Sequence, residues 1–300
     1  MQKIEGELRT NYQNDVTFFE GNFLDKTERF TMKKKWDFFG ATVNKVRASE
    51  GYPIKSFRDL IAQVAIVTLN NSNFEMYYRG QTKDYLNNKS TFYKDRKQKS
   101  IIFPNICRPE RNEDGDYKYS IRQNLIQKRY EDLYKLIDFA NNKNRKRIPY
   151  EVYMALIQHY EIMPTPLIDI TQSLRVAATF ALRRNTKGYL YVFGLPYLNQ
   201  SISYYRDFEI ILLKLQNVVS FDALRPRYQE GYLVGKFPFT NRKDIGDNLA
   251  NRLIAKFELD NSSNNFWDQY FLPMPEEVLF PLDDIVEQNL KDLKTEFDNS

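Results

Sequence analysis

The order of hydrophobic patterns along the chain constrains its fold more than any other feature. Before Gly188 most apolar residues recur at helical spacing, whereas after it come short aromatic and β-branched runs such as 189–193 and 209–213. Runs of this kind are typical of half-buried or buried strands. Helices that come first and strands that come later favour an α+β fold over alternating βαβ units. We therefore expect a helical N-terminal half packed on a mostly antiparallel, strand-rich C-terminal half.

Local signals place individual elements. Ser56 precedes a run at helical spacing over 57–68, and Ser173 precedes a face of small residues over 176–181, so both serines are predicted N-caps. The acidic pair Asp283-Asp284 is typical of a helix start, where it interacts favourably with the helix dipole. Further helices are expected over 120–140, 150–160 and 283–293, and further strands over 74–79, 167–170, 228–234 and 253–259.

Length and composition exclude several classes of protein. The 300 residues, 42% of them hydrophobic and 28% charged, have the balance of a globular protein, and we expect an N-terminal extension over 1–55 followed by one domain over 56–300. The single cysteine, Cys107, excludes an internal disulfide. The single histidine, His159, excludes a site with several histidine ligands, so no metal is expected. The sequence contains no phosphate-loop, dinucleotide or nucleophile-elbow motif.

No stretch of the sequence is suited to a membrane. The N-terminus lacks the apolar core of a signal peptide. No apolar run approaches the ~20 residues that a membrane span needs. We therefore expect a cytoplasmic protein without a membrane partner.

The aromatic and basic residues leave two interpretations open. Phe, Tyr and Trp make up 15% of the chain and the net charge is +5. The aromatic content reflects either compositional drift, which needs no function, or an aromatic surface that stacks bases or nucleotides. The basic stretches 89–99 and 143–147 are either solvated faces or contacts to phosphates. A non-catalytic nucleotide or nucleic-acid binding module is therefore one hypothesis for the function.

The first segment with chemical potential is Tyr78-Arg79-Gly80-Gln81, at the end of a predicted aromatic strand. A guanidinium fork can hold a phosphate through two hydrogen bonds, and a glycine beside it lets backbone approach closely. The plainer alternative is a surface arginine paired with a carboxylate.

The second segment runs from His159 to residue 181 and contains Asp169, Thr171 and Ser173. Thr171 and Ser173 lie at the start of the small-residue helix, where free N–H groups would support an anionic ligand. The alternative is plain capping by Ser173 with a turn at Asp169. His159 is either a half-buried histidine with a structural partner or a catalytic base.

Together the two segments resemble the FRG domain, a family named for its aromatic–Arg–Gly motif. The resemblance extends over roughly residues 56–295, and its further motifs are found at 103–108, 159–181, 227–232 and 279–282. Two positions depart from the family pattern, because many members have glycine where Glu161 stands and arginine where Pro166 stands. Any role of that arginine does not carry over to this chain.

The same motifs resemble, more distantly, ADP-ribosyltransferases of the arginine–serine–glutamate type. Those enzymes have a strand that ends in aromatic–Arg–Gly and a Ser-Thr-Ser block before a helix, in the order found here. The resemblance implies that NAD is the substrate, that Arg79 holds its phosphate or ribose, and that Ser173 positions the nicotinamide ribose. The implied ligand-binding residues are Tyr78, Arg79, Gly80, Gln81, Asp169, Thr171 and Ser173.

The catalytic acid of this resemblance has no clear counterpart. Such enzymes carry a glutamate two residues after another Glu or Gln, whereas Gln229-Glu230-Gly231 puts glycine at that spacing. Glu230 and Gln229 are the candidates for this role, and His159 is the third candidate catalytic residue. The acid would stabilise an oxocarbenium-like ribose while the bond to nicotinamide loosens and an acceptor attacks. The implied function is an ADP-ribosyltransferase-like toxin or defence effector of bacterial or phage type, with a protein or nucleic-acid acceptor.

Overall fold

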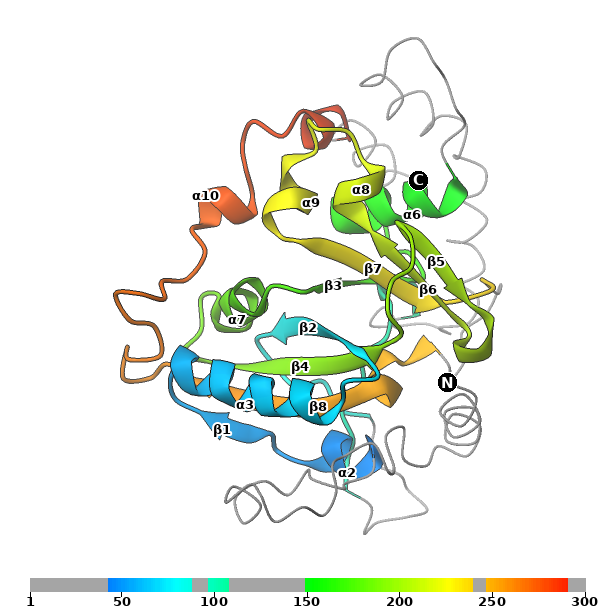
Figure 1. Ribbon diagram of the computed structural model, residues 1–300. Helices are drawn as coiled ribbons and strands as arrows, with labels where there is room; N and C mark the ends of the chain where they lie inside the picture. Colours follow the sequence, from blue (N-terminus) through cyan, green and yellow to red (C-terminus); the bar gives the residue numbers. More distant parts are fainter. Residues whose placement is uncertain (1–42, 88–96, 108–148, 240–246, 291–300) are drawn as a thin grey trace, which may run out of the picture. The chain divides into compact units, whose positions relative to one another are not determined.

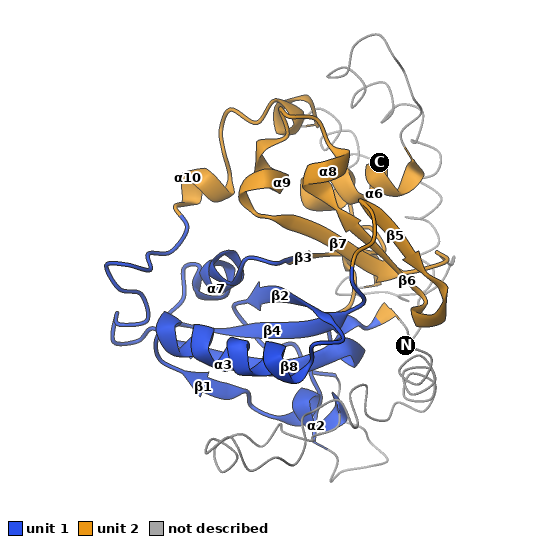
Figure 2. Cartoon of the chain, viewed as in Figure 1, with its two compact units in different colours: residues 1–102, 171–197, 248–274 blue, residues 103–170, 198–247, 275–300 orange. Residues whose placement is uncertain are grey.

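A computed structural model of the chain describes residues 43–87, 97–107, 149–239 and 247–290. The helix expected over 120–140 lies outside these residues. The chain forms two compact units, each built from three separate segments of the sequence (Figure 2). Unit 1 comprises residues 1–102, 171–197 and 248–274, and unit 2 comprises residues 103–170, 198–247 and 275–300.

Unit 1 contains a four-stranded sheet (Figure 1). Its strands follow the order β1 (Tyr52–Ile54), β8 (Leu253–Asp260), β4 (Lys187–Leu195) and β2 (Glu75–Gln81). The β1–β8 pair is parallel and the other two pairs are antiparallel. The helices of this unit are α2 (Val43–Ala48), α3 (Phe57–Asn70) and α7 (Leu174–Leu182), with a 3₁₀ turn, η6, at Leu249–Arg252.

One face of the unit 1 sheet is shaped to receive helix α7. Gly80 on β2 and Gly188 on β4 lie directly beneath this helix, and a Cβ atom at either position would overlap the backbone of Ala177 or Ala181. Since Ala177 and Ala181 also belong to the small-residue face of α7, helix and sheet approach each other at backbone distance. This packing fixes where α7 begins relative to β2.

Unit 2 contains strands in the order β3 (Leu167–Thr171), β7 (Gly231–Lys236), β6 (Ile210–Lys214) and β5 (Ile202–Tyr205), except that Thr171, the last residue of β3, belongs to unit 1. The β5–β6 and β6–β7 pairs are antiparallel. Its helices are α6 (Tyr150–His159), α8 (Leu215–Val218), α9 (Leu224–Tyr228) and α10 (Glu276–Leu279), with 3₁₀ turns η2 (Asn105–Cys107) and η4 (Arg206–Phe208). Helix α6 is buried along most of its length and packs with Ile211, Leu213 and Leu233 of the sheet.

Most of the expected elements within the described residues are confirmed. Ser56 caps α3, since its hydroxyl accepts a hydrogen bond of 3.1 Å from the backbone N–H of Asp59. Asp284 caps a helix over 285–290, since its carboxylate accepts a hydrogen bond of 2.9 Å from the N–H of Glu287. The strand expected over 228–234 begins only at Gly231, because the chain up to Tyr228 forms α9.

The eight described strands and the helices confirm a mixed α and β fold with mostly antiparallel pairing. The helical N-terminal half is not confirmed, because β1, β2 and β3 all precede residue 172 and each unit mixes helices with strands. The described part of the expected extension over 1–55 comprises α2 and β1, and β1 pairs with β8 of unit 1. Among the described helices, none has the length and apolar character needed to cross a membrane.

Candidate functional site

In unit 1, the end of strand β2 lies beside the turn that leads into helix α7. Tyr78 pairs directly with Thr171, the last residue of β3. Gly80 lets helix α7 approach strand β2 closely, because the α-carbon of Gly80 faces the backbone of Ala177. The two motifs noted in the sequence are therefore two sides of one packing contact.

Arg79 points to the sheet face opposite α7, because side chains alternate along a strand and Gly80 faces the helix. Its register partner on β4 is Tyr191. Burial raises the pKa of Tyr191, the Asp84 carboxylate raises it further, and the charge of Arg79 opposes both. Gln81 lies on the same face, and its buried side-chain oxygen accepts no hydrogen bond from the described part of the chain.

A buried ion pair adjoins Arg79 on this face. Lys256 is opposite Tyr191 on strand β8 and is fully buried. Its ammonium lies 2.7 Å from the Asp84 carboxylate and 2.8 Å from the Ser100 hydroxyl, and the Tyr191 hydroxyl donates to Asp84 at 2.9 Å. Burial lowers the pKa of Lys256 and Asp84 opposes this shift. The sequence does not predict this cluster, and its one signal is a lysine within an otherwise mostly apolar strand.

The turn at Thr171-Gln172-Ser173 is held by its own side chains. The backbone N–H of Ser173 donates to the Thr171 hydroxyl at 2.9 Å, and the Gln172 amide donates to Glu75 at 2.6 Å. Glu75 also accepts a hydrogen bond of 2.7 Å from Tyr77. Ser173 occupies the N-cap position of α7, but its hydroxyl makes no capping hydrogen bond. Its side chain is therefore not used as a plain cap.

In unit 2, His159 and Asp169 form a close pair. The ring nitrogen Nδ1 of His159 lies 2.9 Å from the carboxylate of Asp169. His159 is 3% exposed and ends helix α6, whereas Asp169 lies within strand β3 and not in a turn. The other ring nitrogen, Nε2, is buried and has no hydrogen-bond partner among the described residues. Leaving a buried polar atom unpaired costs about 1–3 kcal/mol.

The carboxylate of Asp169 is held from a second side. The Gln158 amide donates to it at 3.0 Å, and the Thr165 hydroxyl donates to the carbonyl of Gln158 at 2.9 Å. The backbone N–H of Leu167 in turn donates to the Thr165 hydroxyl at 3.2 Å. His159 and Thr165, two residues of the segment 159–181, therefore share a role. His159 contacts Asp169 directly, and Thr165 orients it through Gln158.

The segment 229–231 lies against the histidine ring in the same unit. A Cβ atom at Gly231 would be 3.2 Å from Cε1 of His159, so the glycine makes room for the ring. Gln229 is buried, and its amide donates to the carbonyl of Leu279 at 2.7 Å. Glu230 is exposed and adopts a left-handed backbone with φ of 46°. Unit 2 thus brings the three candidate catalytic residues into one region.

Position 161 carries glutamate, although its backbone conformation favours glycine. Its φ of 55° lies in the left-handed region that favours glycine, the residue common there in the family that the sequence resembles. Its carboxylate lies 3.2 Å from the guanidinium of Arg225. This ion pair gives the glutamate a partner at a strained position.

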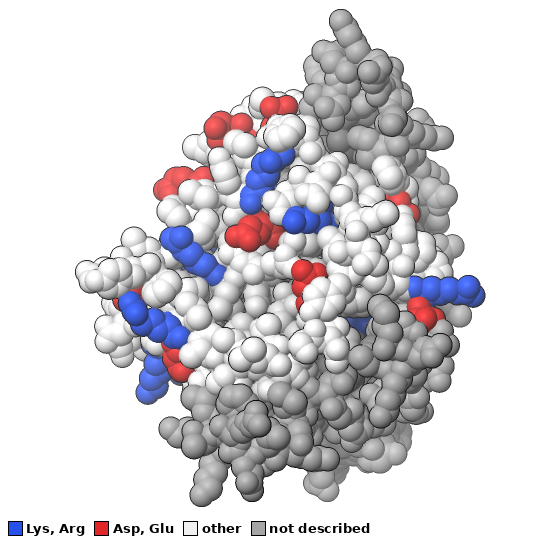
Figure 3. Space-filling view, in the orientation of Figure 1, with Lys and Arg blue, Asp and Glu red and all other residues white. Residues whose placement is uncertain are grey.

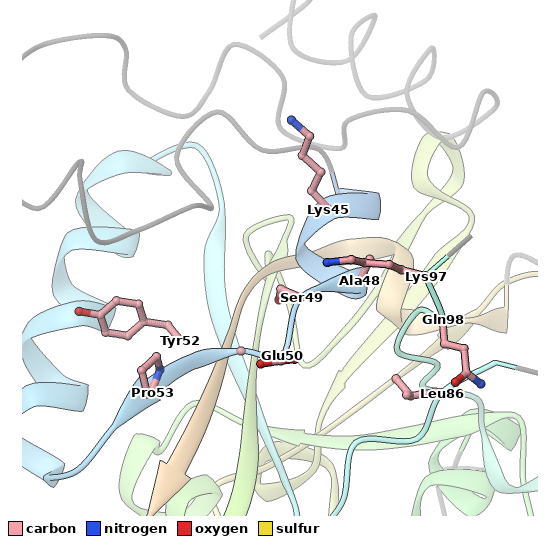
Figure 4. Close-up of a pocket in the computed structure, with 10 residues that line it drawn as sticks. Lys45, Ala48, Ser49, Glu50, Tyr52, Pro53, Leu86, Lys97 and Gln98 are labelled. Atoms are coloured by element: carbon pink, nitrogen blue, oxygen red, sulfur yellow. The ribbon is translucent and has the colours of Figure 1, made fainter. Parts of the chain in front are cut away.

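Other features of the surface do not coincide with these residues. A cavity of about 810 Å³ in unit 1 is lined by residues of 45–53 with Leu86, Lys97 and Gln98, none of them predicted for the site (Figure 4). On the face shown in Figure 3, acidic and basic side chains of the described residues are interspersed. The basic residues 89–96 and 143–147 lie outside the described residues. Among the residues that the structure covers, no three His, Cys, Asp or Glu side chains are grouped as for a metal ion.

Comparison with known families supports part of the resemblance. Residues 74–189 match the family model of the FRG domain, a narrower range than the motifs suggested. This range contains Arg79, Ser173, His159 and Asp169 but not Glu230. No curated protein matches the chain, and no solved structure does. The likeness to ADP-ribosyltransferases is therefore not supported by these comparisons and enters only as a proposal.

Proposed function

We propose that this protein is an NAD-utilising, ADP-ribosyltransferase-like enzyme that binds the dinucleotide at the Arg79 and Ser173 segments of unit 1. The observation that carries the proposal is the direct pairing of Tyr78 with Thr171. It sets the strand that bears Arg79 beside the turn that bears Ser173, the two segments that the sequence resemblance assigns to NAD.

The chemistry of the two segments supports a phosphate-bearing ligand. Arginine is suited to hold a diphosphate through two parallel hydrogen bonds. Ser173 keeps a hydroxyl that α7 does not use as a cap, and it stands at the end of a nine-residue helix where backbone N–H groups favour negative charge. Since Arg79 points away from α7, a dinucleotide that contacts both groups would pass around the end of strand β2.

The proposed reaction transfers ADP-ribose to an acceptor of protein or nucleic acid and releases nicotinamide. Catalysis would rest on stabilising the positive charge that develops on the ribose, which is the task of a carboxylate. Glu230 is the candidate for this carboxylate. Gln229, the other candidate of this segment, carries a neutral amide that donates to the carbonyl of Leu279, so it could contribute a hydrogen bond but not the charge. The scheme uses no metal and no thiol.

The proposal is tested with purified protein, radiolabelled NAD and a cell lysate as the source of acceptors. We expect release of nicotinamide and transfer of label. Arg79→Ala should weaken NAD binding about 10- to 100-fold, the range for loss of a hydrogen-bonded charge contact. Arg58→Ala is the matched control, because Arg58 is an exposed arginine of the same unit, paired with Asp268. It should bind NAD like the wild type.

The competing hypothesis makes the opposite forecast. If the protein neither binds NAD nor releases nicotinamide, the proposed function is wrong. Binding to single-stranded RNA that falls steeply as salt rises would then favour the nucleic-acid binding module. Both measurements use the full chain.

A further inference from the structure

We infer that His159 is held as a proton acceptor through its Nε2 atom and that Asp169 is the residue that positions it, not a ligand contact. All of the residues involved lie in unit 2. The inference rests on the contacts of the ring itself and does not depend on the proposed function.

The partner of Nδ1 decides which ring nitrogen is free. An ionised carboxylate can only accept hydrogen bonds, so the 2.9 Å contact requires a hydrogen on Nδ1. In the neutral ring the lone pair therefore lies on Nε2. That atom is buried and has no partner among the described residues. A histidine with a purely structural role would have both nitrogens paired.

The neighbours of Asp169 determine which group each of its carboxylate oxygens faces. Because the Thr165 hydroxyl donates to the carbonyl of Gln158, the amide NH₂ of Gln158 must face Asp169. One carboxylate oxygen thus accepts a hydrogen bond from Gln158 and the other contacts His159. The Asp169 side chain is 33% exposed although the ring beside it is not, so the pair lies near the surface of the unit.

The ring is also given room. Gly231 places no side chain of its own against the imidazole, since a Cβ there would come within 3.2 Å of Cε1. Cε1 is the carbon next to Nε2, so a larger residue at this position would press on the part of the ring that is proposed to work.

The test exploits the fact that the chain contains one histidine. In untagged protein labelled with nitrogen-15 histidine, the ring spectrum belongs to His159 alone and reports which nitrogen carries hydrogen. We expect hydrogen on Nδ1 and a bare Nε2 in the neutral ring. A neutral ring with hydrogen on Nε2 would overturn the inference.

Asp169→Asn provides the decisive comparison. Gln158 still donates toward this side chain, so the new carbonyl must face Gln158 and the new NH₂ must face Nδ1. We therefore expect the hydrogen to move from Nδ1 to Nε2. In Asp169→Asn combined with Gln158→Met the asparagine can reverse, and the wild-type pattern should return. Asp222→Asn, an exposed aspartate of the same unit, should change nothing. An unchanged ring in Asp169→Asn would refute the positioning role.

Discussion

Gly80→Ala is the sharpest structural test of how the Arg-Gly motif works. Besides overlapping the carbonyl oxygen of Ala177, a Cβ at this position would lie 2.6 Å from the backbone nitrogen of Ala181 and 2.9 Å from the carbonyl carbon of Ala177. Ordinary contacts of this kind are about 3.5–4.0 Å. Helix α7 must therefore move by roughly 1 Å or more, although it is packed on both β2 and β4.

The size of the effect follows from the kind of atoms involved. Overpacking a core costs typically about 1–3 kcal/mol, and side chains usually relieve part of it by changing rotamer. Here the opposing atoms are backbone, which has no such freedom, so we expect a loss in the free energy of unfolding of about 3 kcal/mol. For the same reason, shortening Ala177 to glycine in the Gly80→Ala variant should not restore stability.

Urea unfolding of the full chain measures this loss. Trp267 stacks on Phe57 within unit 1 and reports on that unit by fluorescence, provided that Trp36 is replaced by phenylalanine. With a slope of about 3 kcal/mol per molar urea, the midpoint should fall by about 1 M. Leu69→Ala, which removes an exposed side chain from α3, serves as the control. A midpoint of Gly80→Ala equal to that of this control would refute the close contact between α7 and β2.

Two further predictions concern buried polar groups. Lys256→Met should cost about 3–5 kcal/mol of stability, because it leaves the Asp84 carboxylate without its buried partner, whereas adding Asp84→Asn should recover most of the loss; equal stability of the two variants in urea would contradict this. Burial, followed by the Asp284 carboxylate, raises the pKa of Tyr160 above its ordinary value of 10.0. The unfolded chain therefore loses this proton first, so stability from Tyr160 is fully present below pH 10 and is lost as the pH rises above it. Tyr160→Phe should flatten this alkaline decline in urea midpoints measured from pH 8 to 11, and an equal decline in both proteins would contradict the assignment.

The sequence predicts those elements whose signals are local. Helix α3 has its cap and its periodicity within fifteen residues. Strand β4 has an unbroken aromatic and aliphatic run, and strand β8 has one that only Lys256 and Glu258 interrupt. Strand β1 has no such signal, because it is three residues long, contains Pro53 and forms only by pairing with β8 some two hundred residues away. Each unit joins three distant segments, and no periodicity encodes that assembly.

The candidate site shows the same division. His159 and Asp169 could be selected from their residue types, but their contact depends on the reversal of the chain between α6 and β3, where Glu161 takes a positive φ. From the sequence alone, Asp169 is therefore predicted as a ligand-binding residue, with no sign of its pairing with His159. Lys256 was overlooked because a charge within a strand is read as solvent-facing, whereas its partner Asp84 comes from a loop far away in the sequence.

Packing explains several of the residues that make the motifs recognisable. Gly80 receives the backbone of α7, Gly231 makes room for the histidine ring, and Thr165 orients Gln158. Two other polar groups of the motifs make no hydrogen bond with the described residues that would explain them by packing. The Ser173 hydroxyl makes no cap, and Nε2 of His159 is buried without a partner.

Unpaired buried groups are rare in folded proteins because each one costs stability. Replacing His159 with asparagine keeps an amide donor near the position of Nδ1, facing Asp169, and removes the imidazole lone pair at Nε2. If folding alone selected the histidine, this variant should be less stable than the wild type and keep its activity. Lost activity at equal or higher stability would instead show that the fold bears the cost of an unpaired atom for the sake of a ligand.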